Sequence, residues 1–218
     1  MKTKASAKTL RMVQLAILAA ITLIFAFTPL GYLKVGIIEI TFMVIPVTVG
    51  AMVLGPAAGA ILGAIFGITS FIQCFGMSAF GVFLLGLNPV LTCVTCIIPR
   101  ILCGWLSGLI FRAVHRVDRT RLVSYFVGGL STALLNTLFF MLSLILFFWK
   151  NTMFISKMNE WGIATDNLWL FLIAFVGLNG LVEAIVNSVV GAAIAKAVRH
   201  FLHMDPRPEA AAASTETA

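Results

Sequence analysis

Residues 88–105 read NPVLTCVTCIIPRILCGW, an apolar run that carries a single charged side chain, Arg100. If a helix begins at Pro89, a rise of about 1.5 Å per residue puts Arg100 roughly 16 Å along it, near the middle of a bilayer. A guanidinium keeps its charge, so at that depth it needs carboxylates, carbonyls, water or a ligand as partners. We therefore expect Arg100 to hold the anionic group of a small ligand. A structural ion pair is the alternative.

The composition indicates an integral membrane protein. Of the 218 residues, 61% are hydrophobic and 11% are charged, and the mean hydropathy is +1.07. A soluble domain of this length cannot bury so much apolar surface. The net charge of +7 does not indicate nucleic-acid binding, because the cations lie at the ends of apolar segments and form no basic stripe with aromatics. We expect one all-helical membrane domain over 1–204 and a disordered tail over 205–218.

Apolar segments separated by proline, glycine and polar residues predict six transmembrane helices. The expected helices are Met12–Leu30, Ile40–Leu54, Ala57–Gln73, Pro89–Phe111, Leu122–Trp149 and Leu168–Val198. The expected connections include polar loops at Tyr32–Glu39 and Lys150–Asp166. The stretch Cys74–Leu87 is uncharged but interrupted by glycines, so we expect an irregular or re-entrant outer loop there.

The distribution of basic residues predicts that both termini are cytoplasmic. Eleven of the fifteen Lys and Arg residues fall on one side of the predicted bundle: Lys2, Lys4, Lys8, Arg11, Arg112, Arg116, Arg119, Arg121, Lys196, Arg199 and Arg207. The other side has Lys34, Lys150 and Lys157, and Arg100 lies between the two sides. Positive charge is retained on the cytoplasmic side of a membrane.

A few polar residues are expected to reach the depth of Arg100 on other helices. They are Asn136 on the fifth predicted helix and Asn179 and Glu183 on the sixth, where Asn187 continues the same face. Asn88, Thr92 and Thr95 would line the approach to Arg100, and Phe71 would contribute an apolar wall. These residues form either a cavity open to the outside or a structural network. In the second case Glu183 neutralises Arg100 and the asparagines join helices, at roughly 0.6 kcal/mol per interhelical hydrogen bond.

Small residues at helical spacing predict close helix contacts. Ala16, Ala19 and Ala20 form a patch on the first predicted helix, and glycines recur every four residues at Gly55, Gly59, Gly63 and Gly67. Such patches mark packing within a bundle or docking of a partner. For the glycines, packing within the bundle is the more common explanation.

Motifs of enzymes are missing from the sequence. It has no GxSxG, no HExxH and no Walker A lysine loop. An intramembrane enzyme that uses Glu183 as acid or base lacks a partnering base or metal cluster. The CxxC formed by Cys93 and Cys96 has no second ligand pair, so we interpret these cysteines as small hydrophobic residues. We expect no enzymatic activity, and neither a metal nor a cofactor in this chain.

Four features together resemble the substrate-binding S components of energy-coupling factor (ECF) vitamin transporters, over roughly residues 8 to 200. They are the Ala16/Ala20 patch, the block ITFMVIPVTVGAMVLGPAAGAILGAIFGITSF at 40–71, the uncharged loop before Asn88-Pro89, and the Pro99-Arg100 pair. The chain looks most like the pantothenate-type branch.

The resemblance implies a six-helix subunit of the cell membrane that binds a vitamin from outside and docks onto a transmembrane coupling protein with two ABC-type ATPases, which use the ATP. It implies that the alanine patch (Ala16, Ala19, Ala20) and the neighbouring small residues Gly59 and Gly63 dock there. It also implies that Arg100 and Asn136 hold pantothenate, with the arginine on its carboxylate. Another water-soluble vitamin, of the folate, riboflavin or thiamine-precursor class, and a stand-alone channel or facilitator remain as alternatives.

Overall fold

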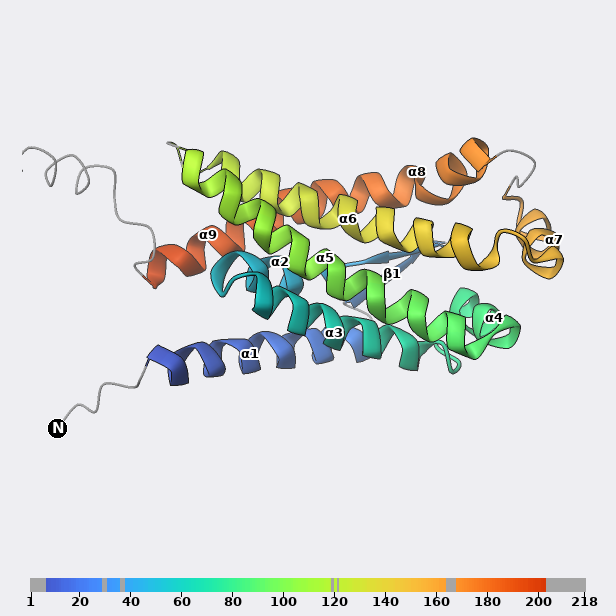
Figure 1. Cartoon of the computed structure of the whole chain (residues 1–218), viewed down its shortest axis with the longest axis horizontal. Helices are drawn as coiled ribbons and strands as arrows, with labels where there is room; N and C mark the ends of the chain where they lie inside the picture. The colour runs from blue at the N-terminus through green and yellow to red at the C-terminus, as the bar shows by residue number, and fades with distance from the viewer. Residues whose placement is uncertain are drawn as a thin grey trace, which may run out of the picture.

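The computed structural model is an elongated bundle whose helices run mostly along its long axis (Figure 1). It describes residues 7–28, 31–35, 38–118, 120, 122–163 and 168–202; within these, the side chains of 7, 32–35, 38–40, 168–170, 174–175 and 178–179 lie outside the description. In that part of the chain, five helical stretches are long and apolar enough to cross a membrane: Lys8–Phe27, Pro56–Gln73, Pro89–Val117, Val123–Phe148 and Gly180–Phe201. The chain is thus an integral membrane helical bundle. The predicted disordered tail, 205–218, lies outside the described residues.

The first third of the chain contains a hairpin that the sequence analysis missed. Its elements are α1 (Ala7–Phe27), β1 (Tyr32–Val35), β2 (Ile38–Thr41), α2 (Val44–Val53) and α3 (Pro56–Gln73). The two strands are antiparallel, with Tyr32 opposite Thr41. The expected loop at Tyr32–Glu39 and the expected helical start at Ile40 were therefore wrong. Tyrosine, valine, isoleucine and threonine, which favour strands, make up most of the two segments.

Two short helices replace expected loops at one end of the bundle. In the stretch expected to be irregular or re-entrant, α4 covers Ala79–Leu87; in the expected loop at Lys150–Asp166, α7 covers Thr152–Glu160. Each begins at a polar residue that caps its first turn. Ser78 Oγ accepts from the N–H of Gly81, and Asn151 Oδ1 accepts from the N–H groups of Met153 and Phe154.

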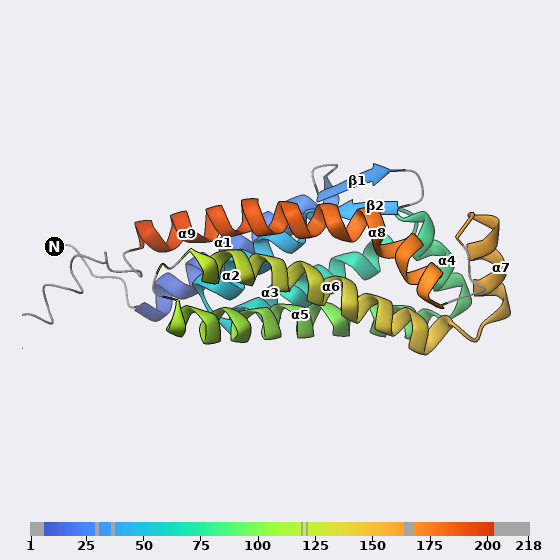
Figure 2. The ribbon, with the colours of Figure 1, turned by 90° about the horizontal axis from the view of Figure 1, so that it is seen from above.

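The remaining helices follow the expected segments closely. They are α5 (Pro89–Val117), α6 (Val123–Phe148), α8 (Leu168–Val186), a π-helical segment η2 (Asn187–Gly191) and α9 (Ala192–Phe201). In Figure 2, α8 and α9 form one continuous rod, so the predicted sixth helix contains a π-helical turn. Between α5 and α6, the N–H of Ser124 and the hydroxyl of Thr120 donate to Asp118 and hold the pKa of its carboxyl below the usual range.

The glycines of α3 pack against α5 inside the bundle. A Cβ on Gly59 would clash with the carbonyl oxygen of Gly104, and one on Gly63 would clash with that of Arg100. Both glycines are buried, so the structure places them in an internal interface. This contact matches the packing explanation for the glycines, and their part in a partner-docking surface stays a prediction. The backbones approach closely because small residues line the contact.

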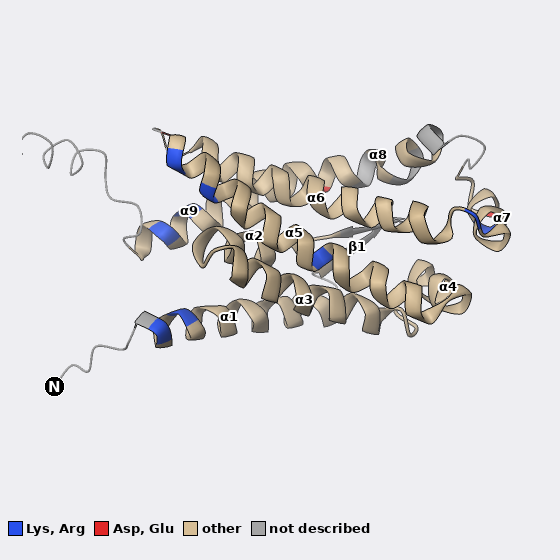
Figure 3. Ribbon diagram, in the orientation of Figure 1, with Lys and Arg blue, Asp and Glu red and all other residues tan. Residues whose placement is uncertain are grey.

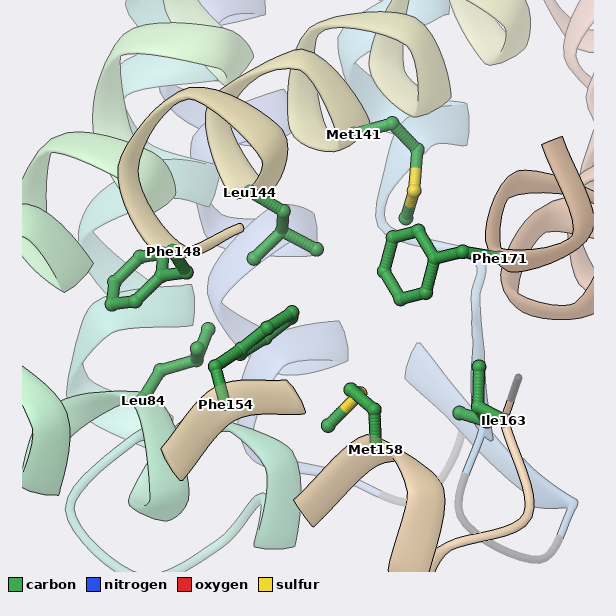
Figure 4. Close-up of a cluster of buried hydrophobic side chains, with 8 residues drawn as sticks. All are labelled: Leu84, Met141, Leu144, Phe148, Phe154, Met158, Ile163 and Phe171. Carbon is green, nitrogen blue, oxygen red and sulfur yellow. The ribbon is translucent and has the colours of Figure 1, made fainter. Parts of the chain in front are cut away.

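One end of the bundle is closed by an apolar cluster that joins α4, α6, α7 and α8 (Figure 4). Its buried members are Leu84, Met141, Leu144, Phe148, Phe154, Met158, Ile163 and Phe171. In Figure 4 the side chains of Met141 and Phe171 point toward each other, and Phe154 points at Leu144. We call this end, with α4 and α7, the capped end.

Basic residues gather at the end opposite the capped end, where α1 begins and where α5 and α9 end (Figure 3). In the described part of the chain they are Lys8, Arg11, Arg112, Arg116, Lys196 and Arg199. A basic position also lies about halfway along α5 in Figure 3.

Candidate ligand-binding site around Arg100

The side chain of Arg100 is buried between aromatic rings. It is 8% exposed, and its Cζ lies 5.5 Å from the ring centre of Phe66 on α3 and 4.6 Å from that of Phe140 on α6. A guanidinium over an aromatic face is attracted by the electrons of the ring, and the attraction strengthens when water is excluded. The two rings therefore hold the charge of Arg100 between α3 and α6.

The hydrogen bonds of Arg100 leave part of its guanidinium without a partner. Nη1 donates to the carbonyl oxygen of Thr95 at 2.8 Å. Nε is buried and has no hydrogen-bond partner among the described residues. An arginine that is fully used for structure would have its buried N–H groups satisfied, because an unpaired buried donor costs on the order of 1–3 kcal/mol.

Two more buried polar atoms near Arg100 have no partner in the described part of the chain. They are Oδ1 of Asn136 and Oγ1 of Thr95. Thr95 lies on α5 one turn before Arg100, and Asn136 lies on α6 one turn before Phe140, the residue that contacts the guanidinium. The three atoms offer an N–H donor, a carbonyl acceptor and a hydroxyl, which are complementary to a polar anion.

Glu183 on α8 belongs to the same region but is not ion-paired with Arg100. Its carboxylate is 6% exposed, and Oε1 accepts from the backbone N–H of Thr41 in β2 at 2.9 Å. The amide of Asn136 and the charge of Arg100 also act on this carboxylate. Among the ion pairs of the described residues, none joins Arg100 to Glu183. The guanidinium therefore has no direct carboxylate partner among the described residues.

The other predicted site residues have local roles. Asn88 caps α5, and its Oδ1 accepts from the N–H groups of Val90 and Leu91. The buried Thr92 donates its hydroxyl proton to the carbonyl oxygen of Asn88 at 2.9 Å. Phe71 is half-buried and meets Phe75 edge to face, with ring centres 5.4 Å apart. These contacts neither support nor contradict a ligand-binding role for Asn88, Thr92 and Phe71. The side chain of Asn179 lies outside the described residues.

Asn187 joins helices, as the structural interpretation expected of the asparagines. Its Nδ2 donates to Thr48 Oγ1 at 2.9 Å and to the carbonyl oxygen of Gly129 at 2.7 Å, and Thr48 Oγ1 lies 3.0 Å from its Oδ1. These contacts connect η2 with α2 and α6. Asn187 is therefore bonded to protein groups, whereas Asn136 keeps an unpartnered oxygen.

The sequence analysis missed Phe66, Phe140 and Thr41 as neighbours of this site. Phe140 carried a usable signal, since it follows Asn136 by four residues and so shares its helix face. Phe66 lies between Gly63 and Gly67 on α3, but the pattern does not reveal which ring meets the arginine. Nothing in the sequence predicts that the N–H of Thr41 meets Glu183, because a hairpin 142 residues away supplies it.

The alanine patch lies on α1, which runs along one edge of the bundle (Figure 1). Ala16 and Ala20 are exposed and Ala19 is half-buried. Exposed apolar side chains surround the alanines, including Met12, Ile17 and Ile24 at 63%, 55% and 56% exposure. This face is smooth at the alanines and apolar around them, which suits contact with lipid or another membrane helix.

Comparison with known proteins adds two findings. The family model described as "ECF transporter, substrate-specific component" matches residues 10–195. A protein of Leuconostoc mesenteroides subsp. mesenteroides, named pantothenate transporter PanT, is 30% identical over 195 residues, which cover 86% of this chain and 91% of that protein.

Proposed function

The chain belongs to the substrate-specific components of ECF transporters, and from this premise we propose that it captures pantothenate at the outer face of the cell membrane. Members of this family are transporter subunits, and this chain is a multi-pass membrane protein that binds a vitamin. The observation that carries the proposal is the guanidinium of Arg100, buried between two rings with its Nε unpartnered in the described structure. The name of the Leuconostoc relative supports the choice of vitamin.

Pantothenate has groups that complement the unpartnered atoms. Its carboxylate accepts hydrogen bonds, as Arg100 Nε requires, and its amide N–H and hydroxyl groups can donate to Oδ1 of Asn136. Phe66 and Phe140 supply the apolar surface that small-molecule sites usually contain. In our proposal Arg100 binds the carboxylate, and Asn136 and Thr95 bind the polar part of the vitamin. Asn88, Thr92, Asn179, Glu183 and Phe71 surround it.

We place both termini in the cytoplasm and count six passes. The five long apolar helices are joined by α2, a shorter apolar helix of ten residues. The basic residues at the end where α1 begins and α9 ends support a cytoplasmic position for that end. The capped end then faces outward, and α4, α7 and the apolar cluster lie over the vitamin.

In the transport cycle we propose, energy comes from partners. The membership of the family implies an energy-coupling module with ATPases, and we assign the exposed Ala16, Ala19 and Ala20 face to its transmembrane coupling protein. The chain itself then needs no ATP site or other cofactor.

Binding of vitamins to the purified protein tests the proposal. Calorimetry with pantothenate, folate, riboflavin and a thiamine precursor should give tight binding of pantothenate alone. Tight binding of another vitamin, with none of pantothenate, would refute the assignment. Purification from native membranes should also recover ATPases and a coupling protein; uptake by the isolated chain without them would instead favour a facilitator.

A further inference from the structure

Pro99 precedes Arg100 in the middle of α5 and changes the hydrogen bonds of the helix there. In an α-helix the N–H of residue 99 would donate to the carbonyl of residue 95. Proline has no N–H, so the carbonyl of Thr95 is not occupied by residue 99. Nη1 of Arg100 donates to that carbonyl at 2.8 Å. With Pro99 at this position, no helical N–H of residue 99 competes with Arg100 for the carbonyl oxygen of Thr95.

This hydrogen bond and the two aromatic contacts restrict the orientation of the guanidinium. Thr95 holds one Nη group, and the rings of Phe66 and Phe140 lie 5.5 and 4.6 Å from Cζ. Nε lies on another edge of the guanidinium, and it has no hydrogen-bond partner among the described residues. A carboxylate is gripped best by two parallel N–H groups on one edge of a guanidinium. In this orientation the edge that carries Nε is available to a carboxylate.

We propose that Pro99 is a positioning residue for ligand capture, which acts through the carbonyl of Thr95 to orient Arg100 toward the ligand's carboxylate. The inference rests on the proposed role of Arg100 as the carboxylate-binding residue. It adds that the arginine is preorganised, so that the conformational cost of ordering its side chain is met before the ligand binds.

If Pro99 had a purely structural role, the expected effects of replacing it on melting temperature and ligand affinity would differ. Pro99 is buried, and α5 packs closely on Gly63 and Gly67 of α3 near this point. If Pro99 only shaped that interface, its replacement would lower the melting temperature and weaken all ligands alike. If it positions Arg100, its replacement selectively weakens ligands that carry a carboxylate.

The decisive variant is Pro99→Ala, measured by calorimetry with two probes, pantothenate and its neutral alcohol analogue. The new N–H competes with Nη1 of Arg100 for the carbonyl oxygen of Thr95, so the hydrogen bond that orients the guanidinium is weakened. We expect pantothenate affinity to fall about tenfold or more, with alcohol affinity within about twofold of wild type. The melting temperature should stay equal or rise, since proline is unfavourable inside a helix. Pro89→Ala is the matched control: at the first position of α5 a missing N–H frees no carbonyl, so both affinities should be unchanged.

The same measurements on Arg100→Ala, alone and with Pro99→Ala, separate the two proposals. We expect Arg100→Ala to lose pantothenate binding and Pro99→Ala to add no further loss. If Arg100→Ala binds like wild type, the proposed function fails. If Arg100→Ala loses binding while Pro99→Ala keeps the full preference for the carboxylate, only the positioning role fails. A Pro99→Ala protein that melts lower, or weakens both probes equally, also overturns the positioning role.

Discussion

The backbone N–H of Thr41 donates to Oε1 of Glu183 at 2.9 Å, across 142 residues of sequence. The contact fixes the end of the β1–β2 hairpin against α8. It also gives the buried carboxylate a partner other than Arg100. Arg100 therefore has no direct ion pair with Glu183, and its Nε has no partner among the described residues.

Replacement of Glu183 should distinguish its hydrogen bond from its charge. Glu183→Gln keeps an oxygen for the N–H of Thr41, so the hairpin should stay docked. Glu183→Leu leaves that N–H without its partner, which costs about 1–3 kcal/mol. We expect a melting temperature several degrees lower for the leucine variant than for the glutamine variant. Equal melting temperatures would show that the contact contributes nothing to stability.

Asn187 should matter for stability and not for ligand binding. Asn187→Leu removes hydrogen bonds to Thr48 and to the carbonyl of Gly129 and leaves that carbonyl without its partner. We expect destabilisation of about 2–4 kcal/mol, while protein that remains folded binds pantothenate normally. Thermal melting measures the destabilisation, and calorimetry on the same sample measures pantothenate binding. Thr48→Val in the same background should add little, because the shared contact is already lost. Loss of binding by well-folded Asn187→Leu would contradict this assignment.

The sequence was sufficient for features set by local chemistry. Gly55 and Pro56 end α2 and start α3, as expected, because Gly55 takes a φ of 101° and Pro56 suits the first turn. The position of Arg100 inside a long apolar helix that begins at Pro89 was also expected. Ser78 and Asn151 are residue types that favour the start of a helix, and they cap α4 and α7. The glycines of the Cys74–Leu87 stretch suggested an irregular loop, yet Gly81 lies within a helix and packs on Cys74.

Features that depend on packing could not be read from the sequence. The two asparagines Asn136 and Asn187 look alike in sequence, and only their neighbours separate them. Asn187 meets Thr48 and Gly129, whereas Oδ1 of Asn136 meets no described donor. The small-residue pattern likewise fits internal and external contacts equally well. Burial decides that Gly59 and Gly63 are internal and that Ala16 and Ala20 are exposed.

Bulk on the alanine face of α1 should uncouple transport from binding. Ala16→Trp and Ala20→Trp fill a smooth exposed surface without touching the region of Arg100, so close approach of a partner helix is blocked. We expect loss of uptake into cells with unchanged pantothenate affinity of the isolated protein. Leu138→Trp, at a position 59% exposed on α6, is the control and should transport normally. Normal uptake by both alanine variants would place the docking surface elsewhere.

The proposed orientation can be tested with a membrane-impermeant thiol reagent. In a Cys93→Ser background, a cysteine at Asn159 on α7 should react in intact cells. One at Thr120, between α5 and α6, should react only after permeabilisation. Both positions are exposed, and the native Cys74, Cys96 and Cys103 are buried. The reverse labelling pattern would move the capped end to the cytoplasm and overturn the proposed route of entry.

The charge of Arg100 should not be enough for binding. Arg100→Lys keeps a cation but loses the planar pair of N–H groups that grips a carboxylate. We expect substantially weaker binding of pantothenate by calorimetry, with the fold retained because a cation still lies near Glu183. Affinity equal to wild type would show that only the charge is required.

The central claim is that Arg100 binds the carboxylate of the ligand, and Arg100→Ala tests it most directly. Pantothenate affinity and melting temperature are measured for this variant alone and combined with Glu183→Gln. The account predicts a folded single variant whose affinity falls by about 30- to several-thousand-fold, the range for a lost buried charged contact of about 2–5 kcal/mol, with no recovery in the double variant. A poorly folded single variant that Glu183→Gln restores, together with recovered binding, would contradict the claim and make Arg100 a structural counterion of Glu183.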